Sequence, residues 1–142
     1  MKLCFVLLGL SLLCGTQNSR GQDHALAVDQ CIAERSGADS VICIEKIKQN
    51  SQAELRRLER ATVLKLKKQS TAGDITVTHY QMAVSALNKA STEFARFSAH
   101  QCEFSVGASG AVASGSGQVR GACHVQLNDW RIQYLKMELS KR

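Results

Sequence analysis

The sequence predicts an all-α fold, a small antiparallel helical bundle with a short N-terminal helix and three longer helices. Three observations indicate this fold. The 142-residue chain contains no proline, so few positions force a helix to break. Alanine, leucine, lysine, arginine, glutamine and glutamate, which favour helix, fill its middle. The signals of strands, Asn-Gly or Asp-Gly turns and sustained polar–apolar alternation, do not occur in the sequence.

The first 21 residues predict export. Lys2 supplies a positive start, and the apolar run Leu3–Leu13 is too short to span a bilayer but has the length of a signal-peptide core. The site Ser19-Arg20-Gly21 suits cleavage. We therefore predict a signal peptide over residues 1–21 and a mature helical domain over residues 22–142.

The location expected from this leader is periplasmic or secreted, with no transmembrane segment. Lipoprotein anchoring through Cys14 is an alternative, although Leu13 stands where a small residue is expected before a lipidated cysteine. Cleavage lowers the formal charge from +6 to +4, because it removes Lys2 and Arg20 and no acidic residue. This mildly basic balance, without a nucleic-acid recognition motif, excludes nucleic acid as the expected partner.

Helical boundaries follow from capping and breaking residues. A first helix is predicted over His24–Arg35, and a turn at residues 36–40 leads into the next helix, with Asp39 or Ser40 as its N-cap. The second helix is expected over Val41–Gln69. It ends at a break in which Gly73 suits a helix stop and Asp74 an N-cap. The third and fourth helices are expected over Ile75–Ser105 and Val119–Leu139.

Apolar side chains at helical spacing predict which faces are buried. In the second helix the predicted core stripe consists of Ile44, Ile47, Ser51, Leu55, Leu58, Thr62 and Leu66. In the third helix the predicted seam consists of Tyr80, Ala83, Leu87, Ala90, Phe94, Phe97 and Phe104. In the fourth helix the predicted inner face consists of Cys123, Leu127, Trp130, Tyr134 and Met137.

Residues Gly107–Gly121 are rich in glycine and serine and are predicted to form a flexible loop. The segment resembles a phosphate-binding loop only in composition, since no Gly-Lys-Ser/Thr follows it and no strand precedes it. Arg120 is its only charged residue.

The mature chain contains four cysteines, and an even count in an exported chain indicates two disulfides. Cys31 and Cys43 flank one helix–turn–helix, and Cys102 and Cys123 flank another. Because local pairing needs no long-range threading, we predict the bridges Cys31–Cys43 and Cys102–Cys123.

The sequence gives little indication of a catalytic or metal-binding site. His100 and His124 lie near Cys102 and Cys123 in the sequence, but in an exported chain a disulfide is favoured over a zinc site. Glu103 has neither a partner carboxylate nor a nucleophile placed with it. We therefore expect a protein that is not an enzyme and uses no cofactor or metal.

The second helix carries a strongly basic face. It contains Lys46, Lys48, Arg56, Arg57, Arg60, Lys65, Lys67 and Lys68. One interpretation is a solvated face stabilised by the pairs Glu54–Arg57 and Arg56–Glu59. The other is contact with an anionic partner, for which the candidate binding residues are Arg56, Arg57, Arg60 and, in the glycine-rich segment, Arg120.

Three parts of the sequence carry a family resemblance. They are Ala53-Glu54-Leu55 after the early cysteine pair, Phe94-x-x-Phe97 before Cys102-Glu103-Phe104, and Cys123-x-x-x-Leu127-x-x-x-Arg131-x-x-x-Leu135. Together they resemble the lysozyme-inhibitor LprI family, small exported helical proteins of bacterial envelopes. The chain departs from the family at Phe97-Ser98-Ala99, where members often have Tyr-Arg-Asp, and at Arg56 and Glu59, where a Leu-Asn-x-x-Tyr motif is usual.

The resemblance implies an envelope protein that inhibits lysozyme by protein–protein binding. The flexible segment Gly107–Gly121 is then the expected inserting element, since long-range attraction between a basic inhibitor and a basic lysozyme is unfavourable. The alternative is a non-inhibitory envelope module that uses its basic helix on an anionic ligand, such as lipopolysaccharide, a phosphate-bearing wall polymer or another envelope protein that is acidic.

Overall fold

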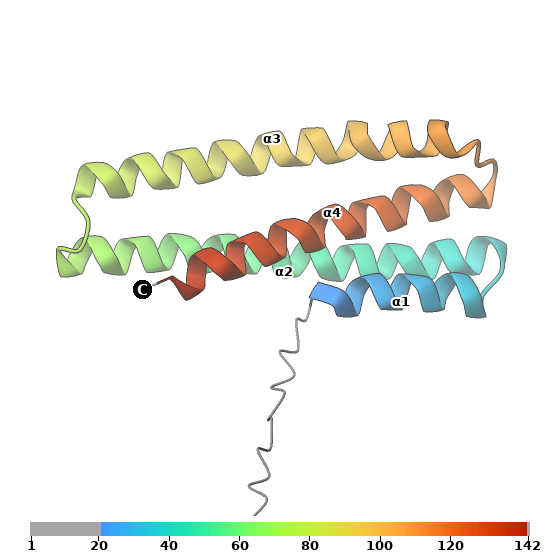
Figure 1. Cartoon of the computed structure of the whole chain (residues 1–142), viewed down its shortest axis with the longest axis horizontal. Helices are drawn as coiled ribbons and strands as arrows, with labels where there is room; N and C mark the ends of the chain where they lie inside the picture. The colour runs from blue at the N-terminus through green and yellow to red at the C-terminus, as the bar shows by residue number, and fades with distance from the viewer. Residues whose placement is uncertain (1–20, 142) are drawn as a thin grey trace, which may run out of the picture.

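The computed structural model describes residues 21–141 and confirms the all-α prediction. The predicted signal peptide and Cys14 lie outside the described residues, apart from Gly21 at the start of the first helix. Four helices make up the described chain (Figure 1): α1 Gly21–Glu34, α2 Gly37–Ala72, α3 Val77–Ser109 and α4 Ser114–Ser140. None of these helices is sufficiently long and apolar to cross a bilayer.

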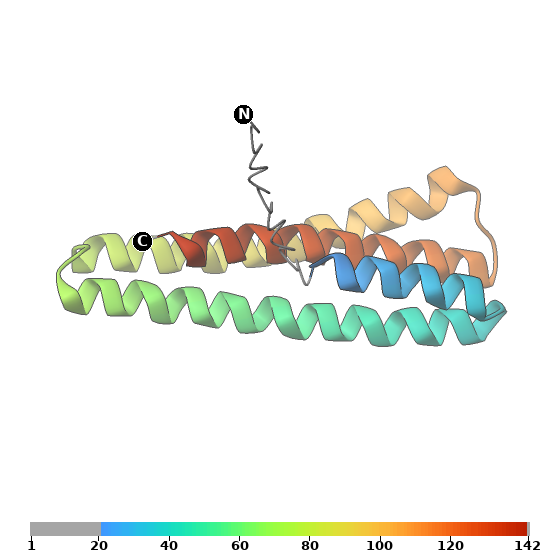
Figure 2. The same cartoon turned by 60° about the horizontal axis from the view of Figure 1, so that its bottom comes forward.

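Helix α4 is the centre of the bundle. Each helix runs antiparallel to the one before it in the chain, which leaves α2 and α4 parallel to each other (Figures 1 and 2). Helices α1, α2 and α3 all pack against α4, and the pair α2–α4 has the most extensive contact. Helix α3 contacts α2 least, and its C-terminal half diverges from α2 in Figure 2.

Two apolar clusters stabilise the bundle. One joins α1, α2 and α4 and contains Val28, Cys31, Ile44 and Val125. The other joins α2 and α4 beneath α3 and contains Leu55, Leu58, Ile132 and Leu135, with Leu87 and Phe94 of α3 packed against it. Between the two clusters lies a buried polar contact, in which the Asn128 amide donates to the Ser51 hydroxyl at 2.9 Å. The predicted stripe of α2 is thus confirmed at its centre, including the polar Ser51.

Two glycines allow α4 to approach α2 closely. Gly117 and Gly121 are four residues apart and therefore lie on one face of α4. A Cβ atom at Gly117 would lie 3.0 Å from Val41, and one at Gly121 would lie 2.5 Å from Ile44 Cγ2. Only glycine fits at position 121 without displacing a neighbour.

Both predicted disulfides are present. Cys31–Cys43 joins α1 to α2 with a Cα–Cα distance of 5.8 Å, and Cys102–Cys123 joins α3 to α4 with a distance of 5.5 Å. Each bridge closes a short loop and contributes about 3 kcal/mol by restricting the unfolded chain.

Helix ends agree with the sequence in part. Gly73 stops α2 in the left-handed conformation with φ 84°, as predicted. The predicted N-caps are wrong: α2 begins earlier, with Ser36 as its N-cap, and Ser40 is buried in the first turn with its hydroxyl donating to the Gly37 carbonyl. Thr76, not Asp74, caps α3, and its hydroxyl accepts the backbone N–H of His79 at 3.1 Å.

The predicted loop over Gly107–Gly121 is wrong. Helix α3 continues to Ser109 and α4 begins at Ser114, so the connection spans only residues 110–113. Each glycine inside a helix costs about 1 kcal/mol relative to alanine, so composition argued for a loop. The close approach to α2 gives two of these glycines a packing role, and tertiary contact overrides the intrinsic preference.

The predicted inner face of α4 is also wrong, because three of its members are exposed. Trp130 is 64% exposed, and Tyr134 and Met137 are at least half exposed. The buried face is instead offset around the helix: Gly121, Val125, Asn128, Asp129, Arg131, Ile132 and Leu135. Polar side chains occupy this face because each has a partner inside the bundle, so apolarity alone selected the wrong face.

Candidate functional site

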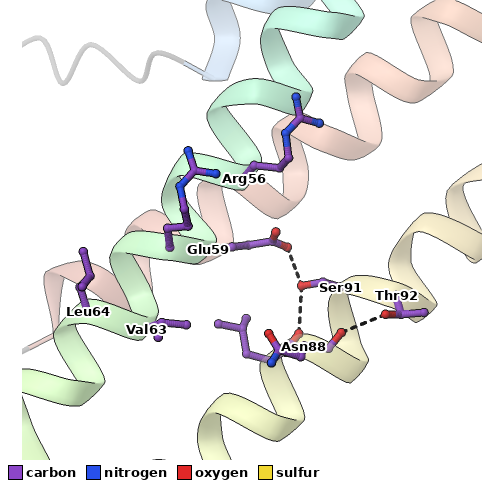
Figure 3. Close-up of a pocket in the computed structure, with 9 residues that line it drawn as sticks. Arg56, Glu59, Val63, Leu64, Asn88, Ser91 and Thr92 are labelled. Carbon is purple, nitrogen blue, oxygen red and sulfur yellow. Dashed lines mark hydrogen bonds between the residues drawn. The ribbon is translucent and has the colours of Figure 1, made fainter.

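Two separate surfaces flank α3 and are candidates for binding. The first, here called the α2–α3 groove, lies between the C-terminal half of α2 and the N-terminal half of α3. Its larger part has a volume of about 600 Å³, and its apolar side chains are Val63 and Leu64 on α2 and Leu87 on α3. The other lining residues are polar or charged. Arg56, labelled in Figure 3, lines the α2 side. Arg60 lines the same side. The groove continues into a smaller part of about 280 Å³ that reaches Phe94.

A network around Arg131 forms the polar side of this groove. The Arg131 guanidinium donates to the Glu59 carboxylate at 3.2 Å and to the Ser91 hydroxyl at 2.9 Å. Ser91 donates to the same Glu59 oxygen at 2.6 Å, a bond drawn in Figure 3. The guanidinium also lies 4.9 Å from the centroid of the Phe94 ring. The network links α2, α3 and α4. In it, the positive charge of Arg131 compensates the negative charge of Glu59.

The predicted basic face of α2 is partly occupied by structural contacts. Arg57 forms a long contact of 3.9 Å with Glu54, whose closer partner is Lys136 at 2.8 Å. Burial alone would raise the pKa of Glu54, but the hydrogen bond and charge of Lys136 outweigh it and lower the pKa below its ordinary value. The predicted pair Arg56–Glu59 is wrong, because Arg131 of α4 holds Glu59.

Other cations of this face also have structural partners. Lys48 pairs with Glu45 at 2.6 Å. Lys65 donates to the carbonyl oxygens of Glu138 and Leu139 at the end of α4. Of the predicted α2 binding residues, Arg56 and Arg60 line the groove and Arg57 does not.

The second surface, here called the aromatic face, lies on α3 and α4. It comprises exposed apolar side chains of both helices, namely Phe97, Phe104, Trp130, Tyr134 and Met137. Phe97 of α3 and Trp130 of α4 line a groove of about 350 Å³, together with Leu127 and Cys123. Side chains predicted for the core thus form an exposed surface.

Covalent and ionic contacts hold the two helices of the aromatic face in register. The Cys102–Cys123 disulfide joins them. Arg120 pairs with Glu103 through both carboxylate oxygens, with Nη2 to Oε2 at 3.0 Å. The Arg120 hydrogen bond lowers the pKa of Glu103, and the Glu103 hydrogen bond raises the pKa of Arg120. The predicted binding residue Arg120 is therefore already paired, on a helix rather than in a loop.

The histidine–cysteine alternative for a metal site does not hold, since Cys102 and Cys123 are bonded to each other. Within the described part of the chain, no group of histidine, cysteine and acidic residues has the geometry to hold a metal ion. His124 instead shares a hydrogen bond of 2.9 Å with Ser98. Burial is the main cause that lowers the pKa of His124 below 6.5.

One buried carboxylate lies on the α1 side of α4. Asp129 Oδ1 is 2.7 Å from His24 Nδ1, and its Oδ2 is buried without a hydrogen-bond partner. Burial raises the pKa of Asp129 above 3.8, and the hydrogen bond from His24 offsets only part of that shift. The pair attaches the start of α1 to the central helix.

The sequence predicted Arg56 and Arg60 as binding residues, but it predicted neither the α2–α3 groove nor the aromatic face. The buried polar residues Asn128, Asp129 and Arg131 were not predicted. A signal for their face was present, since the apolar residues Val125, Ile132 and Leu135 recur at helical spacing. Comparison of the chain with protein-family models, with curated proteins and with solved structures finds no match.

Proposed function

We propose that this chain is an exported envelope protein that inhibits a lysozyme by protein–protein binding, as its resemblance to LprI-type inhibitors implies. It acts by occupying the enzyme and carries out no reaction itself. The two disulfides support export, because such bridges persist in oxidising compartments such as the periplasm or the extracellular space.

The exposed aromatic face is the observation that carries this proposal. Tryptophan, tyrosine, phenylalanine and methionine are enriched at protein interfaces, and a few such residues supply most of the binding energy. Here they project from two helices joined by a disulfide, so little conformational entropy is lost when they bind. With Phe104 67% exposed, these side chains are available to a partner.

The aromatic face replaces the inserting loop that the sequence predicted. Enzyme clefts are lined largely by apolar and aromatic side chains, which suits contact with exposed aromatic side chains. Glu103 neutralises Arg120 at this face, so its interaction with a basic lysozyme is not opposed by that arginine. Binding through this face should therefore depend only weakly on salt concentration.

The test is a binding titration of the oxidised mature protein against chicken-type, goose-type and invertebrate-type lysozymes. Truncating Trp130 and Tyr134 together to alanine should weaken binding by about 2 kcal/mol or more, roughly 30-fold, as for interface hot spots. The matched control is Met82→Ala, which removes an equally exposed apolar side chain of α3 outside the aromatic face. Equal loss in the control, or no loss in the double variant, would exclude this face as the binding site.

A further inference from the structure

The α2–α3 groove has chemistry that the aromatic face lacks. Most of its surface is apolar, although Glu59, Ser91 and other polar residues also line it, and Leu64 is 66% exposed. Its edge carries two guanidinium groups one helical turn apart, those of Arg56 and Arg60. A cleft of about 600 Å³ lies within the size range of small-molecule sites, which are mostly apolar with a few polar groups that fix orientation.

Within the described part of the chain, neither of the two guanidinium groups forms an ion pair. The nearest candidate is Glu59, which also lines the groove, but it accepts hydrogen bonds from Arg131 and Ser91. Among residues 24–141, whose side chains the structure describes, no carboxylate lies within ion-pair distance of Arg56 or Arg60. The groove therefore presents a net positive edge above an apolar wall.

From this arrangement we infer that the α2–α3 groove binds a single-chain anionic amphiphile, a long-chain carboxylate. The carboxylate accepts hydrogen bonds from the forked guanidinium groups of Arg56 and Arg60, for which arginine is geometrically suited. The hydrocarbon chain lies along Val63, Leu64 and Leu87 and removes their apolar surface from water. Neither a free anion nor an uncharged chain uses both parts of the site.

The groove and the aromatic face lie on different sides of α3. Leu87 and Ser91 face the groove, whereas Phe97 and Gln101 face the aromatic surface. Ligand binding in the groove is therefore independent of the lysozyme proposal, and either can fail without the other.

Calorimetric titration of the oxidised protein with sodium dodecanoate, below its micelle concentration, tests the inference. Three further probes separate its parts: butanoate keeps the carboxylate without the long chain, dodecyltrimethylammonium keeps the chain with the opposite charge, and inorganic phosphate is a free anion. We expect saturable binding of one dodecanoate per chain and at least tenfold weaker binding of each other probe.

Variants locate the site. R56A/R60A and Leu64→Glu should each weaken dodecanoate binding at least tenfold, the first by removing the cations and the second by placing a negative charge on the wall. Arg57→Ala and Met82→Glu are the matched controls, since neither residue lines the groove. All five substituted positions are exposed, so folding is expected to be retained, which circular dichroism checks.

Three results would overturn the inference. The first is an absence of saturable dodecanoate binding to the wild-type protein. The second is equal binding of dodecyltrimethylammonium, butanoate or phosphate, which would show that the site does not require an anion joined to a chain. The third is an equal loss of dodecanoate binding in Arg57→Ala or Met82→Glu, which would show that binding depends on the net charge of the protein and not on the groove.

Discussion

The contact between Gly121 of α4 and Ile44 of α2 gives a quantitative test of the packing. In an exposed helix, replacing glycine by alanine stabilises a protein by about 1 kcal/mol. At position 121 the added Cβ would lie 2.5 Å from Ile44 Cγ2, and Ile44 is buried, so the side chain or the helix must shift. Overpacking of this kind costs about 1–3 kcal/mol.

Gly115 provides the matched control on the same helix. A Cβ atom there would have Ala111 as its nearest neighbour at 3.6 Å, an ordinary van der Waals contact. Gly115→Ala should therefore stabilise the protein by about 0.5–1 kcal/mol, whereas Gly121→Ala should destabilise it or leave it unchanged. The predicted difference between the two variants is about 1–3 kcal/mol, which is the cost of the contact alone.

The assay is urea unfolding of the oxidised protein followed by circular dichroism at 222 nm, a standard helix signal. A double-mutant cycle with Ile44→Ala assigns the effect to this pair, because that change removes the clashing Cγ2 atom. In the Ile44→Ala background, Gly121→Ala should be stabilising. If Gly121→Ala stabilises the wild-type protein as much as Gly115→Ala does, α4 does not approach α2 closely and the packing is wrong.

Three further predictions address other contacts. Replacing Cys102 and Cys123 by serine should lower the free energy of unfolding by about 3 kcal/mol, measured against the wild type under oxidising conditions, and an unchanged value would show that the bridge does not form. Arg131→Ala should destabilise the protein by about 3 kcal/mol, because it leaves the partly buried Glu59 without its cation, and Arg131→Ala combined with Glu59→Gln should recover part of that loss in the same unfolding assay. Burial lowers the pKa of His124 below 6.5, so its contribution to stability is present above pH 6.5 and is lost as the pH falls through the folded-state pKa. His124→Gln should therefore flatten the fall in melting temperature between about pH 7 and pH 5, and identical profiles for the two proteins would contradict that assignment.

Much of the fold follows from the sequence because its signals are local. The α2 stripe from Ile44 to Leu58 is regular over several turns, and each disulfide joins cysteines at neighbouring helix ends. Gly73 stops α2 because it adopts a left-handed backbone conformation that other residues rarely adopt. Neither the disulfides nor the end of α2 at Gly73 depends on which side of a helix faces the core.

The region from α3 into α4 was mispredicted because its determinants are tertiary. Glycine content indicated a loop, yet Gly117 and Gly121 at four-residue spacing are also the pattern that lets two helices approach closely. Once that approach fixes the face of α4, the polar Arg131 is buried with partners from α2 and α3, and the aromatic Trp130 is turned outward.

The same distinction applies to the candidate site. Arg56 and Arg60 could be predicted as binding residues from charge, since a run of cations on one helix is visible in the sequence. The groove beside them could not be predicted, because it depends on how α3 packs beside α2, which is a tertiary contact. The aromatic face could not be predicted either, because aromatic residues at helical spacing can be buried or exposed and the sequence pattern is the same in both cases.

The measurement that tests the proposed function most directly is a lysozyme turbidity assay. Lysis of bacterial cells by chicken-type, goose-type and invertebrate-type enzymes is followed at increasing concentrations of the oxidised mature protein. We predict dose-dependent inhibition of at least one type, retained by R56A/R60A and lost when Trp130 and Tyr134 are replaced by alanine. Full lysis by all three enzymes, at protein concentrations well above theirs, would contradict the inhibitor function.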